Sequence, residues 1–173
     1  MPDYTPIADL IGMLEGYEMQ LVGSTAINGE GSDIDIAVNI SDLRQQQIPP
    51  QHLGQPMGNL IANQNRQAHE QANRLVNNLR QAGCEISGGA HYEVFNLTGD
   101  TQFTSFRRGD FNILLCFNIQ SWNRFIKGRD YCIFLRNLGV DMTSKEVRVA
   151  VHGIASGMDI TALTADQERL RVR

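Results

Sequence analysis

The sequence predicts an α/β fold, a small mixed twisted sheet backed by about four helices, in one domain that covers residues 1–173. Two observations lead to this prediction. Short alternating or continuously apolar segments, typical of strands, are interspersed with longer segments whose apolar residues recur every three or four positions, typical of helices. The 173 residues are 42% hydrophobic and 20% charged, which suits one globular domain with a sizeable core.

The composition argues against a membrane or disulfide-stabilised protein. No apolar run approaches the ~20 residues of a membrane span, and the first residues lack the basic and apolar regions of a signal peptide. The three cysteines, Cys84, Cys116 and Cys132, are odd in number and widely spaced. Two of them fall in apolar segments, and we expect these two to be buried thiols in a reducing compartment. We expect no membrane partner.

The charge is unevenly distributed along the chain, although the net charge is only −4. Residues 1–65 hold eight acidic residues and one arginine, whereas residues 104–136 hold six basic and two acidic residues. An acidic region beside a basic one is consistent with a metal-bound nucleotide substrate, although solvation alone explains at least half of these charges. The absence of a dense Lys/Arg block argues against tight sequence-independent binding of nucleic acid.

The first predicted elements are a helix over residues 5–15 and a strand over residues 17–22. Thr5 is suited to cap the helix, Pro6 suits its first turn, and Gly16 ends it.

The next predicted strand carries two acids on its polar face. From Asp33 to Ile40 polar and apolar residues alternate, which places Asp33 and Asp35 on the same face. Residues two apart on a strand lie about 6.5–7 Å from each other. Two carboxylates at this spacing can share a pair of divalent ions about 3.5–4 Å apart.

A Gly-Ser pair lies ahead of these acids, with eight residues between. Gly23 lets the backbone approach a phosphate closely, and Ser24 adds a hydroxyl beside free N–H groups, which predicts an anion-binding turn. A phosphate-holding turn followed by two acids is what a magnesium-bound nucleoside triphosphate needs. The alternative is a surface loop that leads into a strand displaying acids, because an isolated D-x-D is common.

Gly23-Ser24, the eight-residue spacer and Asp33-Ile34-Asp35-Ile36 resemble the signature of the DNA polymerase beta-like nucleotidyltransferase superfamily. The resemblance implies that the serine holds the triphosphate and that the two acids bind the metals. The spacer is a little shorter than the family usually has, so we expect any helix within it to be a single turn or missing.

Residues 41–58 are rich in Gln and Pro and are predicted to form a loop. The loop follows the acidic strand, so a role as a flap over the site is open to it. A helix is predicted over residues 60–82, ended by Gly83, with a solvated outer face rich in Asn and Gln.

Further strands are predicted at residues 85–86, 92–97 and 102–107, the last two forming a hairpin through Thr98-Gly99-Asp100. The apolar run up to Phe117 is long enough for a central strand buried on both faces.

Asp110 stands at the entrance of this buried strand, with Asn112 on the same face. An acid in such a place is costly unless it is paired or metal-bound. The superfamily has a third carboxylate on a later strand beside the D-x-D strand, and Asp110 resembles it. The resemblance implies that Asp110 helps to bind the catalytic metal and accepts the proton of the attacking hydroxyl. Two alternatives remain: Asp110 ends a turn with Gly109, or Asp100 is the third acid.

Two more helices are predicted, over residues 119–138 with Ser121 as N-cap and over residues 144–155 behind the capping box Thr143-Ser144-Lys145-Glu146. Residues 162–172 are predicted to form a short charged helix or a frayed tail. The run from Gly109-Asp110-x-Asn112-Ile113 through the Thr-x-Lys-Glu-x-Arg helix also resembles small nucleotidyltransferase-like proteins of tailed bacteriophages. That resemblance covers most of the chain after residue 17.

The function expected from these residues is that of a metal-dependent nucleotidyltransferase, which passes a nucleoside monophosphate from a triphosphate such as ATP to an acceptor hydroxyl and releases pyrophosphate. All-carboxylate ligation favours Mg²⁺ or Mn²⁺. The predicted catalytic and metal-binding residues are Asp33, Asp35 and Asp110, and we expect these acids to lie at one edge of the sheet. The predicted nucleotide-binding residues are Gly23, Ser24, Arg107 and Lys127.

The acceptor is left open between an RNA end such as that of a transfer RNA, a protein side chain and a small molecule, and the oligomeric state is also open. The expected compartment is the cytoplasm, that of the host if the protein is viral. Two other functions remain. One is a degenerate module of the same fold that binds a nucleotide or a partner without turnover, and the other is a D-x-D sugar-nucleotide transferase that uses Mn²⁺.

Overall fold

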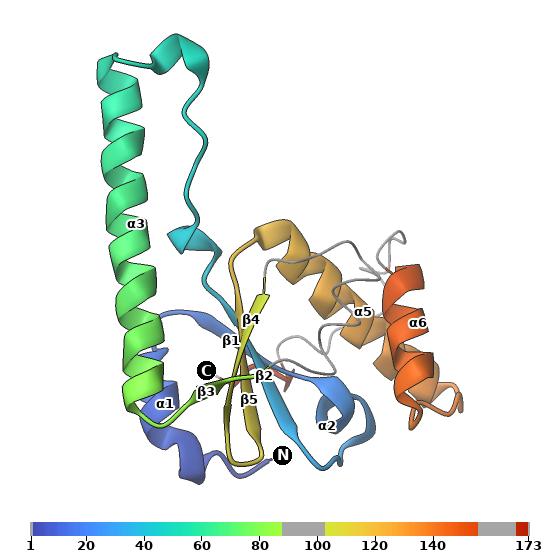
Figure 1. Cartoon of the computed structure of the whole chain (residues 1–173). Helices are drawn as coiled ribbons and strands as arrows, with labels where there is room; N and C mark the ends of the chain where they lie inside the picture. Colours follow the sequence, from blue (N-terminus) through green and yellow to red (C-terminus); the bar gives the residue numbers. More distant parts are fainter. Residues whose placement is uncertain (1, 88–102, 156–168, 173) are drawn as a thin grey trace.

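The predicted α/β fold is confirmed in a computed structural model that describes residues 2–87, 103–155 and 169–172 (Figure 1). A five-stranded sheet has the order β1-β2-β5-β4-β3. Its strands are β1 (Glu18–Val22), β2 (Ile34–Asn39), β3 (Glu85–Ile86), β4 (Phe103–Arg108) and β5 (Phe111–Cys116). Only β2 and β5 pair in parallel, and the other three pairs are antiparallel, so the sheet is mixed.

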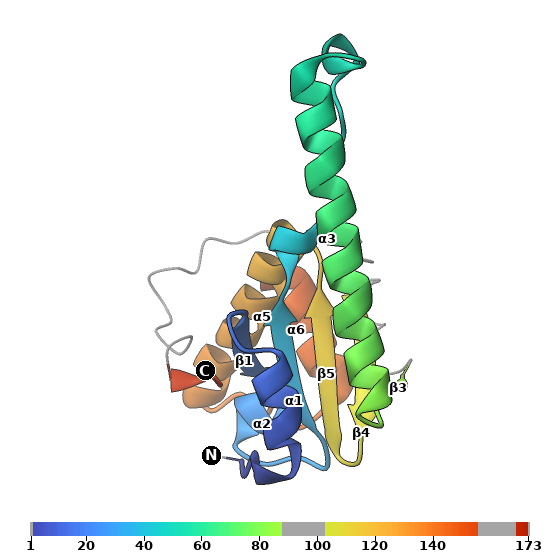
Figure 2. The same cartoon turned by 90° about the vertical axis from the view of Figure 1, so that its left-hand side faces the viewer.

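Helices cover both faces of this sheet. They are α1 (Ala8–Met13), α2 (Gly23–Asn28), α3 (Pro56–Gln81), α5 (Ile119–Asn137) and α6 (Lys145–Ala155), with 3-10 helices at Thr5–Ile7, Ser41–Leu43 and Pro50–His52. The helices α1 and α3 lie on one face, toward the viewer in Figure 2, and α2, α5 and α6 lie on the other. None of the helices in the described ranges is long and apolar enough to cross a membrane.

The core follows from the alternation of β2 and from the apolar run of β5. Ile36 and Val38 pack with α1 and the end of α3, whereas Ala37 packs on the opposite face against Trp122 and Phe125 of α5. All six residues of β5 are buried, as expected for a strand with a neighbour on each side and helices on both faces.

The end of the chain covers one edge of the sheet. The N–H of Leu21 donates to the carbonyl of Leu170, and the N–H of Val172 donates to the carbonyl of Met19. These residues of the predicted C-terminal tail therefore extend the sheet beside β1.

The segment after β2 differs from its prediction. Residues 41–58 were expected to be a loop, but they contain two 3-10 helices and the start of α3, which begins at Pro56 instead of residue 60. Pro56 lies in the first turn, where its missing N–H costs no hydrogen bond. The segment leaves β2 at the end away from Asp33 and runs along α3, so it does not form a flap over the acids (Figure 1).

The predicted N-cap of the helix after β5 was wrong. The N-cap of α5 is Asn118, whose side chain accepts hydrogen bonds from the N–H groups of Gln120 and Ser121, and is not Ser121 itself. At residues 106–107, β4 pairs with β3 on one side and with β5 on the other. The predicted hairpin partner over residues 92–97, together with its turn and Asp100, lies outside the described residues.

Candidate functional site

The predicted Gly-Ser pair and the second acid lie side by side because β1 and β2 are antiparallel neighbours. Val22, the last residue of β1, pairs with Asp35, so the chain enters α2 next to the carboxylate. A methyl group added at Gly23 would lie 2.2 Å from Oδ2 of Asp35, and Gly23 has a φ of +73°. Both the close approach and the left-handed backbone require glycine at this position.

The spacer between the Gly-Ser pair and the acids folds back on itself. The helix α2 has six residues, between one and two turns, and begins at Gly23, so the pair lies inside its first turn. The hydroxyl of Thr25 donates to the carbonyl of Asp33 at 2.7 Å. A methyl group at Gly31 would lie 2.4 Å from Oγ of Ser24, which shows how closely the returning loop approaches the serine.

Asp35 is a buried carboxylate, with 6% of the residue exposed. It pairs in register with Asn112 of β5, whose Nδ2 donates to Oδ1 of Asp35 at 2.8 Å. The amide donates to one oxygen of this carboxylate, while the other oxygen lies close to Gly23. Sequence reasoning placed Asn112 on the face of Asp110 but gave it no role. Its signal was a single polar residue within the apolar run of β5.

Asp33 is half exposed and is held by a cation. Nη2 of Arg107 lies 2.8 Å from Oδ1 of Asp33, and Nε of Arg107 donates to the carbonyl of Gly109 at 3.0 Å. Arg107 comes from β4, and β5 lies between that strand and β2. The guanidinium therefore reaches across one strand to contact the first acid of the pair.

Asp110 lies in the turn between β4 and β5 with an exposed side chain. Its carbonyl accepts a hydrogen bond from the N–H of Ile34 at 2.8 Å, so its backbone is next to Asp33. The ranges that the structure describes contain no group of three or more His, Cys, Asp or Glu side chains that could hold a metal. The structure thus places Asp33 directly before β2 and Asp35 within it, without bringing the carboxylate of Asp110 to them.

The remaining candidates are placed as follows. The acids lie at the entrance of the central strands β2 and β5, and not at an edge of the sheet as expected. Lys127 is partly exposed on α5 and, among the described residues, forms no ion pair with Asp33, Asp35 or Asp110. Arg107 is close to the acids, but in the free protein its partner is Asp33.

These donors are suited to one class of ligand. Carboxylate oxygens are hard donors, and Mg²⁺ is commonly bound by one or two carboxylates together with the phosphates of a substrate. The two acids at the start of β2 fit a metal-bound phosphate, because Gly23 brings its backbone close to the carboxylate of Asp35. They do not provide a complete cage for a metal without a substrate.

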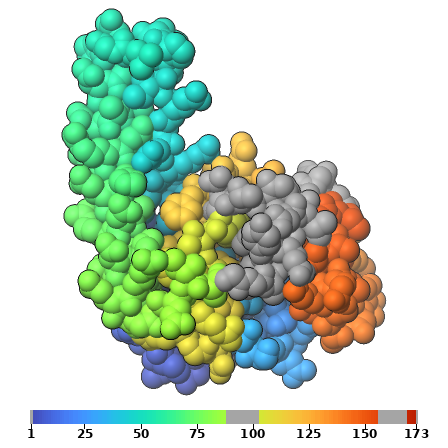
Figure 3. Space-filling view, in the orientation of Figure 1, coloured from blue at the N-terminus to red at the C-terminus, as the bar shows by residue number. Residues whose placement is uncertain are grey.

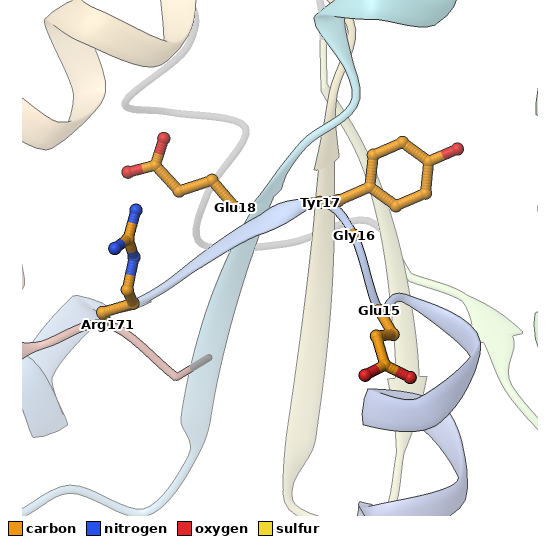
Figure 4. A pocket seen from close by; sticks show the side chains of 5 residues that line it. All are labelled: Glu15, Gly16, Tyr17, Glu18 and Arg171. Carbon is orange, nitrogen blue, oxygen red and sulfur yellow. The ribbon is translucent and has the colours of Figure 1, made fainter.

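A hollow elsewhere on the surface does not bring its polar side chains together. It is lined by Glu15, Gly16, Tyr17, Glu18 and Arg171 (Figure 4). The side chains of Glu18 and Arg171 lie on one side of β1, whereas those of Tyr17 and Glu15 point away from them. None of the predicted site residues lines this hollow, so the face around Asp35 remains the candidate site.

Comparison with protein-family models, curated proteins and solved structures finds no match to this chain. The assignment of the site therefore depends on the residues themselves.

Proposed function

We propose that this protein is a metal-dependent nucleotidyltransferase, which transfers a nucleoside monophosphate from a nucleoside triphosphate to an acceptor hydroxyl. The observation that carries the proposal is the contact between the Gly-Ser pair and the D-x-D strand. Gly23 lies against the buried carboxylate of Asp35, and Asp33 lies two residues earlier, directly before β2. A phosphate bound at the Gly-Ser pair would therefore be next to a metal bound by the acids of the D-x-D segment.

In this mechanism Asp33 and Asp35 would hold Mg²⁺ together with the triphosphate, and the backbone around Gly23 and the hydroxyl of Ser24 would bind terminal phosphate oxygens. The metal, when bound, neutralises the charge that develops on the phosphoryl group. Asn112 orients the carboxylate of Asp35 through the hydrogen bond to its Oδ1.

The acceptor hydroxyl attacks the α-phosphorus, the bond to the bridging oxygen of the β-phosphate breaks, and pyrophosphate leaves. The proton of the hydroxyl passes to a carboxylate. Asp110 is the proposed acceptor of that proton, because its exposed side chain begins the strand next to β2. Its carboxylate would have to turn toward the substrate to take that role.

The test is incubation of the purified protein with Mg²⁺ and ATP, CTP, GTP or UTP, labelled at the α-phosphate, with RNA or protein acceptors from a cell extract. We expect label on one class of acceptor, release of pyrophosphate, and a loss of at least ~100-fold in Asp35→Asn or Asp33→Asn. Unchanged turnover in either variant would contradict the mechanism.

A second function is favoured by two observations. The described residues contain no complete three-acid metal cluster, and Asp33 is already paired with Arg107. Both features are consistent with a module of this fold that binds a nucleotide without turnover. Calorimetric binding of a magnesium-nucleotide with no release of pyrophosphate, in the presence of every acceptor fraction, would favour this function over the enzyme.

A further inference from the structure

The two acids of the D-x-D pair have different partners, and this difference is informative. Asp35 is buried and accepts a hydrogen bond from the neutral amide of Asn112. Asp33 is paired with the cationic guanidinium of Arg107, at 2.8 Å. A divalent ion that used Oδ1 of Asp33 would compete with Arg107 for the same oxygen atom.

The ion pair is of a kind that a competing cation can displace. The side chain of Arg107 is 42% exposed and that of Asp33 is 37% exposed. An ion pair this exposed contributes about 1 kcal/mol at most, so its loss changes the equilibrium constant for binding of a competing cation by about fivefold at most. The Arg129–Asp130 pair is different, because its side chains are only 0% and 2% exposed and Arg129 also donates to Gln20 and to the carbonyl of Leu21.

Arg107 is also placed to serve a second anion. The sheet register puts Asp35, Asn112 and Arg107 side by side on three neighbouring strands. A guanidinium on that row, released from Asp33, would remain on the face where the triphosphate is expected, and its fork of donors matches phosphate oxygens in geometry.

We infer that Arg107 is an exchangeable cation of the site. In the free protein its guanidinium pairs with the carboxylate of Asp33. When a magnesium-nucleotide binds, this ion pair would break, Asp33 would ligate the metal, and the guanidinium would bind the triphosphate. This inference rests on the proposed function. Its consequence is that Arg107 opposes binding of the metal alone and favours binding of the metal with the nucleotide, so the acid pair is loaded by the complex in preference to the free ion.

The first test measures Mn²⁺ binding by calorimetry without any nucleotide. Arg107→Gln removes the competing guanidinium, and we expect its Mn²⁺ affinity to be about three- to fivefold higher than that of the wild type. The matched control is Arg108→Gln. Arg108 is the next residue of β4 and forms its own ion pair with Asp9, on the other face of the strand, so its removal should leave Mn²⁺ affinity unchanged.

The second test measures binding of a non-hydrolysable nucleoside triphosphate in Mg²⁺. Here Arg107→Gln should bind at least ~10-fold more weakly than the wild type, because a charge-assisted contact to phosphate is lost. Opposite changes in the two affinities support the exchange, and circular dichroism verifies that each variant is folded. A merely structural role would lower both affinities together.

Several outcomes would overturn the exchange. They are an unchanged or weaker Mn²⁺ affinity in Arg107→Gln, the same gain in Arg108→Gln, no Mn²⁺ binding to any variant, or an unchanged nucleotide affinity in Arg107→Gln. The Mn²⁺ comparison needs no nucleotide. A wild type that binds no triphosphate would therefore contradict the proposed function, while the metal comparison still decides whether Arg107 and the ion compete for Asp33.

Discussion

Gly23 and Asp35 constrain each other more tightly than any other pair in the candidate site. The added methyl group would lie 2.2 Å from Oδ2 of Asp35, closer than two non-bonded atoms can approach, and the glycine has a φ of +73°. Neither the backbone nor the buried carboxylate can easily yield, since Asn112 holds the other oxygen. The site thus depends on the absence of a side chain at position 23.

Gly23→Ala should therefore lower the free energy of unfolding by about 2–4 kcal/mol, through the left-handed backbone and the overlap with the carboxylate. We also expect weaker binding of a magnesium-nucleotide, because Asp35 must move. Urea unfolding and calorimetry measure the two effects.

Gly29→Ala is the matched control for this prediction. Gly29 ends α2 with a φ of +78°, but a methyl group there would meet no atom within 4 Å. It should lose only about 1–2 kcal/mol of stability, with nucleotide binding unchanged. Equal losses of stability and binding in both variants would show that the backbone conformation alone matters and not the contact with Asp35.

For single residues, the sequence predicts the position of a residue within its own strand or helix better than its contacts with other elements. The alternation of residues 33–40 predicted the strand β2, which begins one residue later, at Ile34, and Asp110 lies at the entrance of β5 as expected. The pairing of Arg107 with Asp33 could not be predicted, because it requires the strand order β2-β5-β4. Asn118 was missed as the N-cap because Ser121, three residues later, is an equally good capping residue.

The element least integrated into the molecule is α3. It has 26 residues, which corresponds to a length of about 39 Å, and it projects beyond the sheet together with the segment that precedes it (Figures 2 and 3). Its buried apolar residues, Leu75 and Leu79, lie in the last two turns. In the projecting part the helix packs on its own preceding segment, where Asn65 exchanges two hydrogen bonds with the backbone of Gln46.

The projecting part is predicted to be dispensable for folding. Replacing residues 47–64 by a short Gly-Ser linker joins Gln46 to Asn65, which are already hydrogen-bonded, and removes no residue of the three core clusters. We expect the free energy of unfolding to change by less than about 1 kcal/mol, since exposed segments contribute little to stability. Urea unfolding of the shortened chain measures this change.

Leu79→Ala is the control on the same helix. Leu79 is fully buried in the core shared with α1, so its truncation should cost about 2–5 kcal/mol. If the shortened chain is as unstable as Leu79→Ala, the projecting part supports the body and the interpretation of α3 as a loosely attached element is wrong.

The lengths of elements were predicted where an apolar stripe marks them and not elsewhere. The helix α3 was predicted from residue 60, and only its first turn was missed, because Pro56 and Gly58 belong to the Pro-rich run that was assigned to a loop. Conversely, β5 and α6 lie close to their predicted ranges because burial or amphipathicity extends along their whole length.

For the whole molecule, the single predicted domain raises the question of whether the layers unfold together. The buried residues form three clusters, and each contains one free cysteine: Cys84 beside α3, Cys116 in β5 and Cys132 in α5. Two of the three were predicted to be buried thiols, and all three are buried. Burial raises the pKa of Cys84, and it raises the pKa of Cys132 to about 12.

These thiols can therefore report on each core separately. Because the thiolate is the reactive form and all three groups are buried, we expect the native protein to be almost inert toward a thiol reagent at pH 8.

The test uses three variants that each retain one cysteine. If the clusters unfold as one unit, the three thiols should become reactive over the same range of urea concentration, coincident with the loss of circular dichroism. Labelling of Cys116 or Cys132 at distinctly lower urea than Cys84 would mean that the α5–α6 layer opens first, and would contradict a single cooperative domain. Exposed-thiol labelling of the fully unfolded variants provides the reference rate, so a slow reaction in the native state is attributable to burial and not to the intrinsic reactivity of the cysteine.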